Sequence, residues 1–320
     1  MQPTGIQAHD AGHSLPRGIA LIVTAFLCSA TMGAVTKSMH QTSPLLMLFF
    51  QYAIGFLCFL PSGLRLGVRE LRTKRLGLQI FRSIAGSACQ LLFFMSLRSL
   101  PLLDSSLLSN SAPLFIPIVV WVWMRKTISL QVAVSLLIGL AGVLLIIHPG
   151  PELLDNPAAL LALASGVLSA VALVATNLLT ETDPPARILL YNFGVSALLM
   201  APVAVPLWKP FSGRVWVMLV SIGVLFALTQ WFIIVAYRYA SATELSPFNY
   251  SVVVFSGILG WVIFGNVPTA AALVGTVLIC GGGILSITKG HAEGRGSWFG
   301  VGHWHWFWKS ARWIGVLERE

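Results

Sequence analysis

Polar side chains recur along one helical face inside an apolar stretch of this sequence. Ser83, Gly86, Ser87 and Gln90 are spaced i, i+3, i+4 and i+7, which places them on one side of a helix. A similar face follows at Ser106, Ser109, Asn110 and Pro113, and the second half of the chain carries Gln230, Ser246, Asn249 and Tyr250. Hydroxyl and amide groups can bind a polar solute, whereas an unpartnered amide in hydrocarbon is costly. We therefore expect these faces to point inward.

Two interpretations of the polar faces stay open, helix packing and a wet cavity. Serine and asparagine often bond one membrane helix to another, at about 0.6 kcal/mol each, and any single serine fits that role. The larger polar groups favour a cavity. We predict a substrate cavity lined by Gln90, Asn110, Gln230, Asn249 and Tyr250, with Tyr191, Asn192 and Trp231 as secondary members.

Arg82 lies about a turn inside an apolar run. A lone arginine near the bilayer centre costs about 2.5–3.5 kcal/mol on insertion scales. Its side chain either extends toward the basic cluster that precedes it or faces the cavity. In the cavity it would attract a carboxylate or a phosphate, so we include Arg82 among the cavity residues.

Four further charged residues lie at the ends of apolar runs, where they are candidates for gating or coupling: Arg98, Asp104, Arg238 and Glu244. Structural roles compete with this interpretation. Glu244 completes an S-x-x-E capping pattern with Ser241, and Asp104 near a helix start complements the helix dipole. Both arginines can extend to the headgroups. An acid at a cavity mouth would instead bind a proton or a cationic substrate.

The elements that carry these residues are apolar enough to cross a bilayer. The 320-residue chain is 56% hydrophobic and only 10% charged, against about 25% charged residues in a soluble domain. Ten apolar runs approach the ~20 residues that a membrane span needs. They lie near 17–37, 45–64, 77–97, 101–124, 128–148, 158–179, 188–208, 215–237, 243–264 and 268–288. We predict an all-α integral membrane protein with ten transmembrane helices.

The chain aligns with itself at a constant offset of 140 positions. Gln90 meets Gln230 and Arg98 meets Arg238, while Asp104 meets Glu244. Each copy contains five spans, and because five is odd the copies enter the membrane from opposite sides. The sequence therefore predicts two inverted five-helix repeats, a construction typical of secondary transporters that work by alternating access.

Lysine and arginine collect in alternate connections, with a dense cluster between Arg65 and Arg75. This bias places both termini in the cytoplasm of a bacterial-type inner membrane. The excess of lysine and arginine over acidic residues is thus explained by the orientation of the helices in the membrane, and we expect no nucleic-acid partner. Four segments follow: a cytoplasmic N-terminal segment (1–18), the first repeat (19–148), the second repeat (159–288) and a cytoplasmic, tryptophan-rich interfacial tail (289–320).

The sequence resembles the drug/metabolite transporter superfamily with two EamA-type five-helix units. The first half carries "PLLDSSLLSNSAPLFIPIVVWVW" followed by "LLIGLAGVLLI". The second half carries "ELSPFNYSVVVFSGILGWVIFG" followed by "LVGTVLICGGGILSI". The latter also resembles subgroups that carry S-adenosylmethionine or riboflavin. The resemblance implies transport of a small organic molecule, by exporters and importers alike.

Several signatures of other functions are missing from the sequence. It contains no G-x-x-x-x-G-K-[ST], no H-E-x-x-H and no pair of carboxylates deep in the spans. We predict no catalytic residue, no metal site and no cofactor. The expected function is secondary transport of an amino-acid-like, S-adenosylmethionine-like or riboflavin-like metabolite, driven by a proton or a counter-substrate. The alternatives are an exporter with proton antiport, an intramembrane enzyme and a non-transporting scaffold. The oligomeric state stays open.

Overall fold

The computed structural model is helical throughout the part of the chain that it describes. Those residues are 14–66, 72–124, 134, 137–138, 141–142, 145, 157–180, 182–208, 210–236, 239 and 246–289. The first half contains α1 (Leu15–Ser38), α2 (Pro44–Leu66), α3 (Leu76–Ser96), α4 (Leu102–Ser109) and α5 (Ala112–Met124). The second contains α7 (Pro157–Thr180), α8 (Pro185–Ala204), η2 (Val205–Leu207), α9 (Gly213–Ala236), η3 (Ser246–Tyr250), α11 (Ser251–Phe264) and α12 (Ala270–Lys289).

Six of these helices are long and apolar enough to cross a membrane. They are α1, α2, α3, α7, α8 and α9, and two shorter apolar helices cover Phe248–Phe264 and Ala270–Ile279. The prediction of an all-helical chain with many spans is confirmed to this extent. Most of the span expected at 128–148 and the tail from residue 290 lie outside the described residues.

The fourth span of the first half is divided into two helices. The sequence suggested one apolar run over 101–124, but α4 ends at Ser109 and α5 begins at Ala112. The Asn110 side chain donates from Nδ2 to the carbonyl of Ser106 at 2.7 Å, so it satisfies a carbonyl at the end of α4. Pro113 is the second residue of α5, a position where its missing N–H costs nothing.

The helix ends follow local chemistry elsewhere as well. Gly265 ends α11 with a positive φ of 68°, a conformation that glycine adopts without steric cost. Its N–H donates to Trp261 at 2.9 Å, and the N–H of Asn266 donates to Gly260 at 3.1 Å. The bond from Gly265 to Trp261 is that of the αL motif, which satisfies a carbonyl of the last helical turn.

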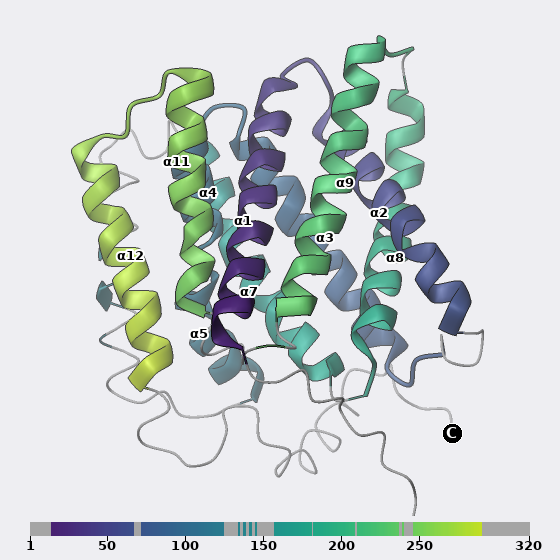
Figure 1. The fold of residues 1–320 in the computed structure, drawn as a ribbon, viewed down its shortest axis with the longest axis horizontal. Coiled ribbons are helices and arrows are strands. Elements are labelled where there is room, and N and C mark those ends of the chain that lie inside the picture. Colours follow the sequence, from purple (N-terminus) through teal and green to yellow (C-terminus); the bar gives the residue numbers. More distant parts are fainter. Residues whose placement is uncertain are drawn as a thin grey trace, which may run out of the picture.

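The helices of the two halves pair reciprocally. At an offset of 140 positions α1 corresponds to α7, α2 to α8 and α3 to α9. The structure packs α1 against α9 and α7 against α3, so exchanging the halves turns one pairing into the other. It also packs α2 against α8 and α4 against α11. In Figure 1, α11 and α12 lie at the left edge and α2 and α8 at the right.

The apolar core consists of two main clusters. One lies around α2, α3, α8 and α9, and the other joins α4 and α7 to η3, α11 and α12. Packing within the first cluster is close: a Cβ added at Gly55 of α2 would lie 2.2 Å from the Phe193 ring of α8. Four rings form an aromatic cluster where α2 meets η2 and α9, namely Phe50, Trp208, Phe211 and Trp216.

Candidate functional site

Polar side chains are buried where α2, α3 and α8 meet. We call them the buried polar seam: Gln51 and Tyr52 of α2, Gln79, Arg82, Ser83 and Ser87 of α3, and Asn192 and Ser196 of α8. None of these side chains is more than 9% exposed. Buried polar groups at this density are unusual in a hydrophobic bundle, and they lie between the two halves of the chain.

Close contacts connect the three helices of the seam. The Ser196 hydroxyl donates to the carbonyl of Ser83 at 3.5 Å, linking α8 to α3. A Cβ on Gly86 would lie 3.8 Å from Oδ1 of Asn192, at the same interface. The Tyr52 side chain interacts electrostatically with Arg82 and lies near Ser87. These contacts join α2, α3 and α8 through Tyr52, Arg82, Ser83 and Ser196.

Arg82 is held at one point of its guanidinium. Its Nε donates to Oγ1 of Thr176 in α7 at 2.7 Å, and that threonine hydroxyl donates onward to Ala172 at 2.7 Å. The Nη1 atom is buried without a hydrogen-bond partner. Within the described part of the chain, no carboxylate lies at ion-pair distance from Arg82. Among the described residues, the positive charge in the seam has no compensating negative one.

Other seam atoms are also buried without a partner. Both side-chain polar atoms of Gln51, Oε1 of Gln79 and Oγ of Ser87 make no hydrogen bond. Leaving such a group unsatisfied costs about 1–3 kcal/mol, and most buried polar atoms in proteins do have a partner. A polar molecule bound in the seam would supply the missing contacts.

A network around Asp183 closes one end of the seam. Asp183 is 3% exposed and lies in the turn between α7 and α8. Its Oδ2 accepts from Oγ1 of Thr73 at 2.7 Å and from Nε2 of Gln79 at 3.2 Å. Its Oδ1 accepts from Nη1 of Arg187 at 2.7 Å. We call these four residues the Asp183 network; it ties the start of α3 to the second half.

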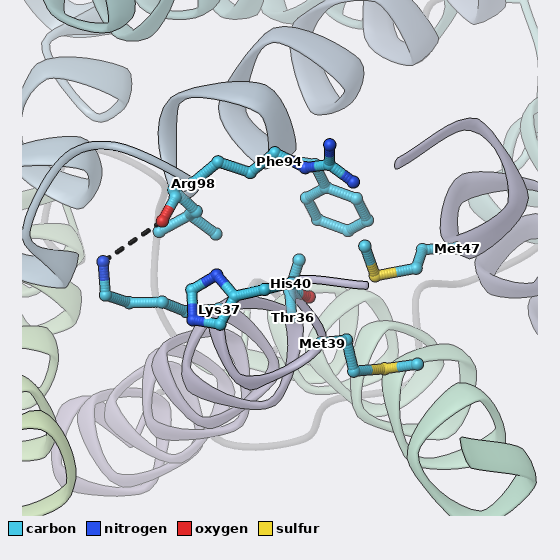
Figure 2. A pocket seen from close by; sticks show the side chains of 8 residues that line it. Thr36, Lys37, Met39, His40, Met47, Phe94 and Arg98 are labelled. Carbon is cyan, nitrogen blue, oxygen red and sulfur yellow. Dashed lines mark hydrogen bonds between the residues drawn. The ribbon is translucent and has the colours of Figure 1, made fainter. Parts of the chain in front are cut away.

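A small pocket lies where α1 and α3 end, at the other end of the bundle from the Asp183 network. It is lined by Thr36, Lys37, Met39, His40, Met47, Phe94, Leu97 and Arg98, as Figure 2 shows. The Lys37 ammonium donates to the carbonyl of Leu97 at 3.1 Å, the dashed line in Figure 2, and also to that of Leu100. Its side chains leave no interior space for even a water molecule, so it is not a metabolite site.

Apolar side chains separate this pocket from the seam. Met47 and Phe94 line the pocket and are 2% and 1% exposed. Met47 precedes Gln51 by one turn of α2, and Phe94 follows Gln90 by one turn of α3. Buried apolar side chains thus lie at one end of the seam and the Asp183 network at the other.

The structure brings some of the predicted cavity residues into the seam. Arg82 and Asn192 belong to it, and Tyr191 is half-buried beside Asn192. Gln90 is half-buried two turns along α3 from Arg82. Gln51, Tyr52 and Gln79 were not predicted, although the first two stand 140 positions before Tyr191 and Asn192. That offset is the signal in the sequence that identifies them.

The remaining predicted residues lie outside the seam. Asn110 bonds within its own turn, and Asn249 and Tyr250 lie in η3, where the buried Oδ1 of Asn249 has no partner. Gln230 is half-buried in α9. Trp231 is 49% exposed, with its ring 6.2 Å from that of Phe59.

Two of the four gating candidates lie within the described residues. Arg98 is exposed and donates from Nη2 to the carbonyl of Thr42 at 2.7 Å. Asp104 is half-buried and interacts electrostatically with Lys37. Both thus lie close to the pocket of Figure 2. Arg238 and Glu244 lie outside the described residues.

Comparison with known proteins gives consistent matches along the chain. A model of the EamA-like transporter family matches residues 16–148 and again 156–288. A riboflavin transporter of Vibrio cholerae is 29% identical over 83% of this chain and 91% of its own length. A pseudopaline exporter of Pseudomonas aeruginosa is 30% identical over 83% and 94%. An S-adenosylmethionine uptake transporter of Rickettsia felis is 24% identical over 85% and 92%.

A solved crystal structure also matches, with a TM-score of 0.60 and 23% identity. The match covers 88% of this chain and all of the other. At this level of identity the likeness concerns the fold alone.

Proposed function

Because the chain belongs to the EamA-like transporter family, we propose that it moves a small organic metabolite through the buried polar seam by alternating access. The observation that carries this proposal is the set of unpartnered polar atoms buried between the two halves. Such atoms are costly in a bundle that only needs to pack. Unpartnered polar atoms can instead form hydrogen bonds with a polar solute that has left water to cross the membrane.

We further propose ten transmembrane helices arranged as two inverted repeats, at 19–148 and 159–288. The reciprocal pairing of α1 with α9 and of α7 with α3 supports this arrangement, as does the constant offset of 140 positions. The start of α1 and the end of α12 lie at the same end of the bundle in Figure 1. That end would face the cytoplasm of a bacterial inner membrane, given the distribution of lysine and arginine.

The two closures of the seam suggest how access alternates. Opening toward the cytoplasm would break the Asp183 network, and opening toward the other side would separate Met47 from Phe94. Arg98 and Asp104 flank the second opening, where they could gate it or couple it to a proton. Arg238 and Glu244 would have the matching roles in the second half.

The relatives suggest candidate cargo molecules. Their names specify riboflavin, pseudopaline and S-adenosylmethionine, all of them small polar metabolites. We propose cargo of this size, with transport driven by a proton gradient or by exchange, in either direction.

Transport by the full chain in proteoliposomes tests the proposal. Labelled riboflavin, S-adenosylmethionine and amino acids are offered, with a pH gradient or with unlabelled solute inside. Gln51→Leu removes two unpartnered polar atoms from the seam and should abolish transport without lowering the melting temperature. Ser221→Ala is the control, because its hydroxyl bonds only within its own helix, to Val217 at 2.7 Å. Full transport by Gln51→Leu would show that the solute does not pass through the seam.

A further inference from the structure

Arg82 presents a buried positive charge to the seam without a carboxylate partner in the described part of the chain. We propose that the transported solute carries an anionic group, a carboxylate or a phosphate, that binds to the Arg82 guanidinium. The inference rests on the proposed transport through the seam and specifies the charge of the cargo.

The geometry of Arg82 fits an anion site. Thr176 holds its Nε at 2.7 Å, which fixes the plane of the guanidinium. The Nη1 atom is buried with no partner and is the donor left for a ligand. An arginine whose position is already fixed loses little conformational entropy when an anion binds.

Neighbouring groups can complete the coordination of an anion. The Ser87 hydroxyl is a buried donor, and Tyr52 interacts with both Ser87 and Arg82. The amide of Gln51, which precedes Tyr52 on α2, is buried without a partner. Carboxylate and phosphate groups have several lone pairs and are bound most strongly by charged donors supplemented by neutral ones. The seam therefore offers one charged donor and several neutral donors.

The fold itself does not require this charge. The position that corresponds to Arg82 in the second half is Ile222, 140 positions on, and it is fully buried in α9. The position that corresponds to Gln79 is Leu219, which is also fully buried. Since α3 and α9 make equivalent helix pairings, an apolar residue suffices for packing there. Packing at this position therefore does not call for the Arg82 charge, which is available to bind a ligand.

Asp183 does not neutralise Arg82. Both of its carboxylate oxygens are engaged, by Arg187 on one and by Thr73 and Gln79 on the other. Gln79 stands between the two charges, three residues before Arg82 on the same helix. The Asp183 carboxylate, which contacts α3 through Gln79, is thus occupied in the Asp183 network.

The pocket at the other end of the seam has the same polarity. The charged side chains of Lys37 and Arg98 line it beside His40, and none of the described lining residues is acidic. Asp104 offsets part of the Lys37 charge, while His40 and Arg98 remain exposed. A positive mouth above a buried arginine would raise the local concentration of an anionic solute.

Two measurements on the full chain test this inference. In the first, thermal unfolding of the wild type is followed with citrate, with inorganic phosphate and with chloride at equal ionic strength. Citrate and phosphate stabilise folded proteins in general, so the informative quantity is the increase over chloride in the wild type minus the increase in Arg82→Gln. This difference should be positive for the anion that matches the cargo, whereas Arg214→Gln, which changes an exposed arginine at the start of α9, should show the same increase as the wild type. Equal increases in the wild type and Arg82→Gln for both anions would overturn the inference.

The second measurement is transport in proteoliposomes of glutamate against glutamine, glycerol 3-phosphate against glycerol, riboflavin and S-adenosylmethionine. We expect an anionic member to be carried and Arg82→Gln to reduce its rate by about tenfold or more, since a lost charge-assisted bond has that effect. Arg82→Lys should retain part of the rate. Transport of neutral or cationic members only, or an unchanged rate in Arg82→Gln, would refute an anionic cargo but leave the transporter intact. Transport of none would refute the proposed function itself.

Arg82→Met separates a binding role from a structural one. Because the corresponding residue is isoleucine, the variant should melt at or above the temperature of the unliganded wild type while losing transport. A lower melting temperature would assign Arg82 to the support of the fold and overturn the proposal.

Discussion

Replacing Asp183 with asparagine should open the seam at the end where α3 meets the α7–α8 turn. Asp183 and Arg187 are joined at 2.7 Å, with side chains 0% and 12% exposed, so solvent screens the pair little. Hydrogen bonds to charged groups contribute about 1.5–3 kcal/mol. Asparagine keeps one acceptor for Thr73 or Gln79 but loses the charge that holds Arg187. We expect a loss of about 2–3 kcal/mol from the closed state, a shift of roughly 30- to 150-fold in its population.

Labelling of Cys89 measures this shift. Cys89 is half-buried on α3, with its sulfur 3.4 Å from the Ser165 hydroxyl of α7. In a chain whose other three cysteines, Cys28, Cys58 and Cys280, are changed to alanine, a water-soluble maleimide should react faster by a factor within that range in Asp183→Asn.

Arg187→Gln should give a similar acceleration, and the double variant should add little to either single change, because both remove the same bond. Arg214→Gln is the control for a lost surface charge. If Cys89 reacts at the wild-type rate in a folded Asp183→Asn protein, the network is not the closure that we describe.

Two further changes test the packing of the bundle. Gly55→Ala should lower stability by about 1–3 kcal/mol, because its Cβ would lie 2.2 Å from the Phe193 ring; Gly213→Ala, with nothing within 4 Å, is its control in a thermal melt. Gly265→Ala should cost about 1–2 kcal/mol, since φ is 68° there; an unchanged melting temperature would contradict the left-handed end of α11.

The sequence was informative where periodicity and repetition carry the signal. Apolar runs predicted the long helices, and the i, i+3, i+4 spacing placed Ser83 and Ser87 on a face that is buried. Gln51 and Tyr52 were not predicted, because two adjacent polar residues in an apolar run form no helical periodicity. Only the comparison with Tyr191 and Asn192, at the constant offset of 140 positions, identifies them.

Other features depend on contacts that are distant in sequence. Asp183 accepts hydrogen bonds from Thr73 and Gln79, which lie more than a hundred residues away in sequence. The residues next to Asp183 in the sequence do not predict those partners. The break at Asn110 arises where the α4–α5 turn packs on α7: a Cβ on Gly166 would lie 2.7 Å from the carbonyl of Leu108. Such close approaches are set by tertiary packing and leave no local pattern.

The aromatic cluster of Phe50, Trp208, Phe211 and Trp216 has a consequence for the lipid environment. Trp208 is 48% exposed and Trp216 is 37% exposed, and both rings contact the buried Phe50 of α2. Tryptophan prefers the headgroup layer, so this cluster should set the depth of α2, η2 and α9 in the bilayer. In a bilayer that is too thin or too thick these helices would have to tilt together. The acyl-chain length of the lipids is therefore a variable to control in any reconstitution.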